Sequence, residues 1–285
     1  MKKWIIVAES GSDITYDEAR KLGVEIVPMY VSMGGKSYDD GTFPSDDICK
    51  YYEETKELPK TSGSTPSDFI ELYDRIHAEH PEARILHLAY SAVTTISYDS
   101  SCAAAEGRDY VSIIDTRHVS VGQRAVVLQT LELLKDEPDI EKEELLRRVR
   151  AICDRTKMNF LPANLDYLHA GGRCSNLELW GSRILHLHPC IEIQEGKLIA
   201  TTKYRGSFKK VVQKLIRDCA EKDQLRKDRL WLICTPGLSD EMKQIAEGTS
   251  RELGFRDIAW VKTGCVITTH GGYGAFGIVG ISEKG

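Results

Sequence analysis

Short apolar segments alternate with amphipathic segments through the first half of this chain, and this alternation constrains its fold more than any other feature. The strand-like segments are Trp4–Ala8, Val24–Val31, Arg84–Tyr90 and Tyr110–Asp115. Apolar side chains recur at helical spacing behind Pro66, over Ser97–Glu106 and over residues 125–135. Strands and helices in alternation are typical of a parallel sheet with helices on both faces. The sequence therefore predicts an N-terminal three-layer α/β/α domain.

The pattern changes from about Asp139. Glu141–Thr156 is a charged amphipathic segment, which we interpret as a helix connecting two domains. A hairpin around Glu195-Gly196 and two helices follow, one basic (Phe208–Lys222) and one with Ser239 as its N-cap. The predicted strands are Ile191–Gln194, Leu198–Thr202, Leu230–Cys234, Ile258–Val261, Val266–Thr269 and Gly277–Ile281. We expect a C-terminal α+β domain with a mixed sheet at residues 156–285, after an N-terminal domain at residues 1–155.

Size, charge and cysteine content restrict the class of protein. At 285 residues the chain exceeds the comfortable size of one core, and its formal net charge of −5 makes nucleic acid an unfavourable main partner. No apolar run approaches the roughly 20 residues that span a bilayer, and the first run stops at Glu9, too short for a signal peptide. The eight cysteines form no Cys-x-x-Cys pair. We expect a cytoplasmic protein with reduced thiols and no integral membrane association.

Two glycine-rich segments and one hydroxyl-rich segment are the candidate functional features. They are Thr269–Gly274, which contains His270, Leu168–Arg173, and Thr61–Pro66. Glycines let a backbone approach a ligand closely, and a guanidinium grips a carboxylate or phosphate with two hydrogen bonds. Together these segments favour a site for a small anion. Plain turns are the alternative for the first two, and capping of the helix behind Pro66 is the alternative for Thr61 and Ser62.

Other motifs carry less weight. Gly272-x-Gly274-x-x-Gly277 fits a dinucleotide fingerprint only as a string, because the chain ends before the helix and acidic residue that motif requires. The chain has no phosphate-binding P-loop and no Gly-x-Ser-x-Gly elbow. His186 and His188 lack further ligands at metal spacing, so packing is the favoured interpretation. We expect no metal and no cofactor.

A series of segments, in order, resembles the DegV family of bacterial fatty-acid-binding proteins. They are Ala8–Asp13, Ile26–Pro28, Tyr38–Asp40, Thr61–Ser64, Asp115–Gln123, Leu165–Ser175, Leu185–Gly196 and Thr269–Gly274. Leu165–Ser175 is the strongest match. Thr61-Ser62-Gly63-Ser64 is similar to the family's Thr-Ser-Gln-Pro but lacks the Gln and Pro. The largest departure is Tyr90–Ser100, which carries one extra residue near Ile96 and predicts an altered head-group loop.

The resemblance implies a DegV-like fold that buries a long-chain fatty acid and presents its carboxylate to a separate ATP-dependent kinase subunit. The protein would then be a lipid-binding carrier in phospholipid metabolism, with catalysis by the partner. The implied carboxylate ligands are Thr61, Ser62, Ser91, Thr94 and His270, and Arg173 would act near the head group during phosphoryl transfer. The alternative is a stand-alone enzyme acting on a small keto or phosphorylated metabolite, since the first domain is similar to dihydroxyacetone kinase subunits.

Overall fold

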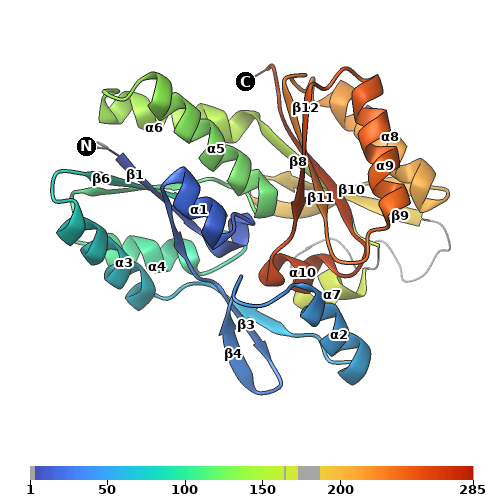
Figure 1. The fold of residues 1–285 in the computed structure, drawn as a ribbon, viewed down its shortest axis with the longest axis horizontal. Helices are drawn as coiled ribbons and strands as arrows, with labels where there is room; N and C mark the ends of the chain where they lie inside the picture. The colour runs from blue at the N-terminus through green and yellow to red at the C-terminus, as the bar shows by residue number, and fades with distance from the viewer. Residues whose placement is uncertain (1–3, 164, 173–186, 285) are drawn as a thin grey trace.

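The computed structural model describes residues 4–163, 165–172 and 187–284. Figure 1 shows two main sheets with helices packed outside and between them. The first sheet contains β1 (Trp4–Glu9), β2 (Val24–Val27), β6 (Arg84–Ala89) and β7 (Val111–Asp115). Its order is β2-β1-β6-β7, and every pair is parallel. The predicted parallel sheet of the first half is confirmed.

The alternating side chains of β1 explain why this sheet has helices on both faces. Ile6 and Ala8 pack with the layer that contains α1 (Tyr16–Leu22), α5 (Ser120–Asp136) and α6 (Lys142–Arg155). Ile5 and Val7 point to the opposite face, where they pack with α3 (Pro66–Glu79) and α4 (Ser97–Ala105). Because both faces of a parallel sheet are buried, its strands carry apolar side chains on both faces. All six residues of β1 are buried.

The second half forms a mixed sheet, as predicted, with six strands, of which β8 was not predicted. Its strands are β8 (Thr156–Leu161), β9 (Leu187–Gln194), β10 (Lys197–Arg205), β11 (Arg229–Cys234), β12 (Asp257–Lys262) and β13 (Phe276–Ile281). The order is β10-β9-β8-β13-β11-β12, and only β11 and β12 run parallel. Helices α8 (Phe208–Lys222) and α9 (Asp240–Glu252) cover the outer face, and α5 packs against the inner face (Figure 1).

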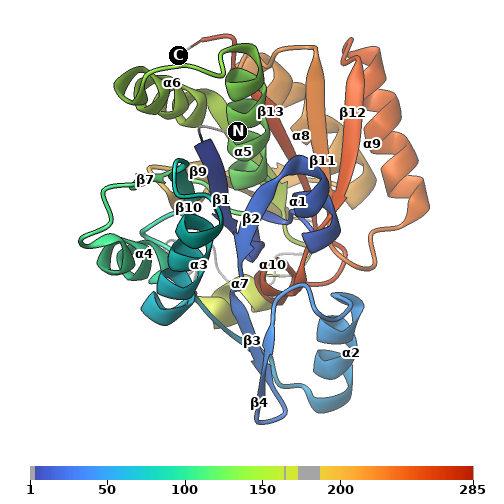
Figure 2. The ribbon, with the colours of Figure 1, turned by 60° about the vertical axis from the view of Figure 1, so that its left-hand side comes forward.

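A small third sheet, which the sequence analysis did not anticipate, lies beside the ends of the two main sheets. It consists of β3 (Tyr30–Met33), β4 (Lys36–Asp39) and β5 (Lys60–Ser62), all antiparallel. Three helices lie next to it: α2 (Asp46–Thr55), α7 (Asp166–Gly171) and α10 (Cys265–Gly271). In Figures 1 and 2, α7 and α10 lie between the small sheet and the six-stranded sheet. This arrangement brings three distant parts of the sequence together.

Two predicted strands are wrong. Val24–Val31 is divided at Pro28, and its two parts join different sheets as β2 and β3. Val266–Thr269 lies within helix α10. The domain boundary between residues 155 and 156 separates the residues of the two main sheets, and it stays a prediction because α5 packs against both. Within the described ranges, no helix combines the length and apolar character needed to cross a bilayer.

Candidate functional site

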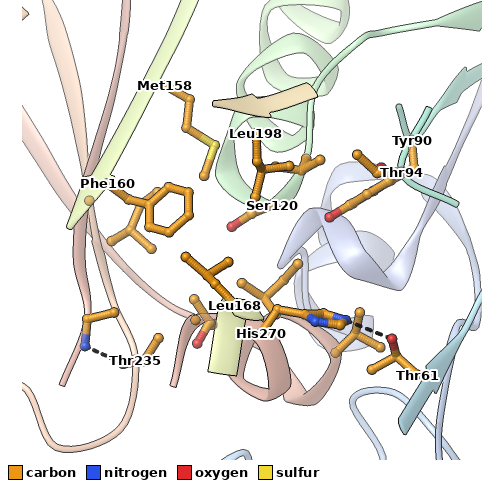
Figure 3. A pocket seen from close by; sticks show the side chains of 18 of the residues that line it. Thr61, Tyr90, Thr94, Ser120, Met158, Phe160, Leu168, Leu198, Thr235 and His270 are labelled. Atoms are coloured by element: carbon orange, nitrogen blue, oxygen red, sulfur yellow. Dashed lines mark hydrogen bonds between the residues drawn. The ribbon is translucent and has the colours of Figure 1, made fainter. Parts of the chain in front are cut away.

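A mostly apolar cavity lies where the three sheets approach one another. It contains about 790 Å³ of empty space, the part open to solvent included. The larger apolar side chains that line it include Met29, Val119, Met158, Phe160, Leu168, Leu198 and Ile233. Figure 3 shows Met158 and Phe160 on one side of this space and Thr61 on the other. The cavity therefore has an apolar end and a polar end.

Thr61 and His270 form the polar end. Thr61 lies in β5 and His270 in the last turn of α10, and Thr61 Oγ1 lies 2.8 Å from His270 Nε2 (Figure 3). Both residues are half-buried and line the cavity. In the tautomer that carries the proton on Nε2, the imidazole donates to Thr61, whose own hydroxyl proton is then available for a ligand oxygen. The pair can thus serve a carboxylate as a hydrogen-bond donor.

The alternative role of Thr61 and Ser62, capping the helix behind Pro66, is wrong. Thr65 is the N-cap of α3, and it forms a reciprocal capping box with Asp68. Ser62 instead lines the cavity beside Thr61. The hydroxyl of Thr65 therefore caps the helix, whereas Thr61 and Ser62 line the cavity.

The backbone at Gly171 lies close against the imidazole ring of His270. A Cβ built on Gly171 would lie 2.3 Å from Nδ1 of His270 and 3.0 Å from its Cε1. No carbon atom tolerates such distances, so glycine allows the end of α7 to approach the ring. The two glycine-containing segments noted in the sequence meet at this point, although both are helix ends and not plain turns.

The loop before α4 forms the other wall of the polar end. Thr94 and Thr95 line the cavity, and Thr94 Oγ1 donates a 2.9 Å hydrogen bond to the carbonyl oxygen of Ser91. A Cβ on Gly63 would lie 2.4 Å from Thr95 Oγ1 and 2.5 Å from Ser97 Oγ. The glycine that stands in place of the family's Gln thus makes room for the loop that carries the extra residue. Gly63 and the loop before α4, the two places where the sequence departs from the family pattern, are therefore in contact.

Ser91 does not join the other predicted ligands. It is fully buried, and its hydroxyl donates a 2.8 Å hydrogen bond to the carbonyl oxygen of Gly196 in the β9–β10 turn. Ser91 is not among the residues that line the cavity. Its bond to a ligand carboxylate stays a prediction, and in this structure its hydroxyl links the two halves of the chain. Arg173, the predicted catalytic residue, lies outside the described residues.

A pair of buried carboxylates beside the cavity was missed as a functional feature. Asp13 and Asp40 both accept hydrogen bonds from the backbone at the start of α10. Burial raises the pKa of Asp13 to about 7 and raises that of Asp40 as well. Both residues stand in segments that match the family pattern. The match did not reveal what the two carboxylates do, because the amides that they bind lie more than 200 residues later in the sequence.

Among the described residues, no group of three or more His, Cys, Asp or Glu side chains is placed to hold a metal ion. The seven described cysteines are free, and six of them are buried. Burial raises the pKa of Cys153, Cys190 and Cys265 to about 12, so these thiols stay protonated at neutral pH. The chemistry available at the cavity is therefore that of hydroxyls and one imidazole.

Comparisons with known proteins agree with this architecture. The model of the family described as "Uncharacterised protein, DegV family" matches residues 3–283. A DegV domain-containing protein of Listeria monocytogenes is 30% identical, with 97% of this chain and 98% of that protein covered. A Thermotoga maritima protein named a fatty acid-binding protein is 28% identical, with 98% of both chains covered.

Solved structures give the same result. A DegV family protein of Thermus thermophilus, described as fatty-acid binding, superposes with a TM-score of 0.88. It is 26% identical, and the match covers 98% of this chain and 99% of that one. A DegV lipid binding protein of Thermotoga maritima gives a TM-score of 0.82 at 26% identity, with 98% of both chains covered. The order of the motifs, the fold and the family match agree, and the chain belongs to the DegV family.

Proposed function

We propose that this protein binds a long-chain fatty acid, with the acyl chain in the apolar part of the cavity and the carboxylate at Thr61 and His270. The observation that carries the proposal is the polarity of the cavity, which is apolar at Phe160 and Met158 and hydrogen-bonding at Thr61 and His270. Each buried methylene contributes roughly 0.8 kcal/mol, so a long acyl chain offsets the cost of association. A carboxylate at the mouth needs donors, which these side chains supply.

The similar proteins of Thermus thermophilus and Thermotoga maritima support this proposal, since they are described as fatty-acid or lipid binding. The cavity of the present chain has the chemistry that such a ligand needs. Ser62 and Thr94 line its polar end and are further candidate ligands of the carboxylate.

The finer part of the proposal concerns what happens to the bound acid. The protein acts as a carrier subunit, and a separate ATP-dependent kinase phosphorylates the exposed carboxylate. Arg173 acts near the head group in that step, where a guanidinium can stabilise charge on the transferred phosphoryl group. The halves at residues 1–155 and 156–285 act as two domains that enclose the acyl chain between and within them.

Native mass spectrometry of protein purified from cells tests the proposal. We expect a co-purifying species with the mass of a fatty acid, which delipidation removes and added fatty acid restores. A matched variant, Phe160→Arg, places a charge in the apolar part of the cavity and should purify folded but empty. A protein that binds no fatty acid and turns over a small keto or phosphorylated metabolite unaided would contradict the carrier and support an enzyme.

A further inference from the structure

Helix α10, which carries His270, begins without a cap of its own. Its N-cap residue is Gly264, which has no side chain to accept a hydrogen bond, and the helix is only seven residues long. Helices this short are unstable alone, and their first backbone amides need partners. These partners come from the other half of the chain.

Two carboxylates hold the start of α10. Asp13 Oδ1 accepts a 2.7 Å hydrogen bond from the Gly264 amide. Asp40 Oδ1 accepts bonds of 2.8 Å and 3.1 Å from the amides of Cys265 and Val266. Asp13 and Asp40 are 6% and 1% exposed. Negative charge at a helix N-terminus is favourable, and hydrogen bonds to ionised oxygens are the stronger kind.

Each carboxylate is itself fixed by a serine. Ser10 Oγ donates to Asp40 Oδ2 at 2.9 Å and accepts from the Met29 amide at the same distance. Ser120 Oγ, which lines the cavity, donates to Asp13 Oδ2 at 2.5 Å. The pair is also tightly packed, because a Cβ on Gly264 would lie 3.1 Å from Asp40 Oδ1 and 3.4 Å from Asp13 Oδ1. The start of α10 cannot shift without breaking hydrogen bonds to these carboxylates.

We propose that Asp13 and Asp40 are positioning residues of the fatty-acid site, which fix the start of α10 and thereby hold His270 against Thr61 at its other end. This inference rests on the proposed function, which identifies the ligand as a fatty acid. The hydrogen bonds from the start of α10 to the two carboxylates explain how His270 is held. Neither carboxylate is among the residues that line the cavity, so the effect on binding is transmitted through the helix. The carboxylates also join the halves of the chain, since 251 and 225 residues separate Asp13 from Gly264 and Asp40 from Cys265.

The positioning depends on pH. The titratable and charged groups that face the two carboxylates are each other, Arg124, Tyr16, Cys265 and Cys234, and Arg124 is itself paired with Glu18. With a pKa of about 7, Asp13 is partly protonated at neutral pH. A protonated Asp13 can keep both contacts only if Ser120 reverses its hydroxyl, and its neutral oxygen then holds the Gly264 amide less strongly. Fatty-acid affinity should therefore fall as Asp13 takes up its proton.

The test compares wild type with Asp13→Asn and Asp40→Asn, with Ser10→Ala as a second way to loosen Asp40. Asp39→Asn is the matched control, since it makes the same change at an exposed neighbour. Hydrogen exchange in the absence of lipid should be about tenfold faster at the amides of residues 264–266 in the variants, and fatty-acid affinity should fall by a similar factor. The control should match wild type in both readouts.

The pH profile separates positioning from a merely structural role. The difference in affinity between wild type and Asp13→Asn should grow as pH rises through about 7. Every other titratable group is the same in both proteins, so the difference isolates Asp13. Unchanged amide exchange in all three variants, or an affinity difference independent of pH, would overturn the proposal. If wild type binds no fatty acid, the proposed function fails, and amide exchange alone then decides whether the carboxylates hold α10.

Discussion

His270 Nε2 lies 2.8 Å from Thr61 Oγ1, although 209 residues separate the two in the sequence. One residue stands at the end of α10 and the other in the small sheet, so their contact exists only when both parts are docked. The polar end of the cavity is thus a product of tertiary structure. Its function should respond to changes that move either partner.

Thr61→Val removes the hydroxyl while it keeps the shape of the side chain. We expect a loss of roughly 1–3 kcal/mol in fatty-acid binding, about 5- to 150-fold in Kd, because a desolvated carboxylate loses a donor. Isothermal titration measures this loss. Thr55→Val is the matched control, since the exposed Thr55 hydroxyl bonds only to the backbone of α2 and the segment after it. Equal affinity in the two variants would remove Thr61 from the site.

Gly171→Ala should weaken binding through His270. The added methyl group would lie 2.3 Å from Nδ1, so the ring must move away from Thr61. Affinity should fall about as far as in His270→Ala, and the double variant should be no worse than either single one, because both act on one contact. Gly248→Ala on α9 is the control, since a Cβ there meets nothing within 4 Å. Additive losses would show that Gly171 acts elsewhere.

Asp13→Asn should change the pH dependence of stability. The folded protein raises the Asp13 pKa from 3.8 to about 7, so in this window the folded state holds a proton that the unfolded state has lost. This contribution to the free energy of unfolding is present below pH 3.8 and falls as pH rises to about 7. The variant lacks this pH dependence, so the stability of wild type should fall relative to that of the variant as pH rises from about 4 to about 7.

Other groups also contribute to the pH dependence of stability, Asp40 and His118 among them. Asp40 acts in the same direction as Asp13, whereas burial lowers the pKa of His118 to about 4, which makes stability rise with pH. The difference between the urea-unfolding curves of wild type and Asp13→Asn cancels both. A difference that does not vary with pH across the window would contradict the raised pKa.

Arg173→Ala should separate binding from phosphoryl transfer. If Arg173 serves the transferred phosphoryl group, the variant keeps fatty-acid affinity within a few-fold and loses nearly all acyl-phosphate formation with the kinase. Thr61→Val should show the reverse, with the main loss in binding. Titration beside a coupled kinase assay measures both. Equal loss of affinity in the two variants would make Arg173 a ligand of the bound acid.

Phe160→Leu should shift the preference for chain length. The ring lies at the apolar end of the cavity, opposite Thr61 (Figure 3), so a smaller side chain leaves room for a longer acyl chain. Each additional buried methylene contributes roughly 0.8 kcal/mol. Competition between two saturated acids that differ by two methylenes should favour the longer one more in the variant than in wild type. An unchanged ratio would place the end of the acyl chain elsewhere.

Most strands of the two main sheets and most helices were predictable because their signals are local. The apolar run Trp4–Ala8 and the apolar spacing behind Pro66 appear in the structure as β1 and α3. Pro28 was a local signal too, since it lacks a donor and divides the predicted strand Val24–Val31. Thr61, Ser62 and Thr94 line the cavity, and their role as carboxylate ligands stays a prediction.

The error at Val266–Thr269 has a different origin. Val266, Ile267, Thr268 and Thr269 are β-branched, and that composition favours a strand. The segment is helical because Asp13 and Asp40, far away in the sequence, supply the hydrogen bonds that start the helix. Ser91 is a similar case, since its hydroxyl bonds to a hairpin turn 105 residues later. A single sequence carries no signal for such pairings.

A crystal structure of the protein saturated with a long-chain fatty acid tests the central claim most directly. We expect elongated density along Met158 and Phe160, with the carboxylate about 3 Å from Thr61 Oγ1 or from His270 Nε2. An empty cavity at saturating ligand, or a carboxylate bound away from both side chains, would contradict the account.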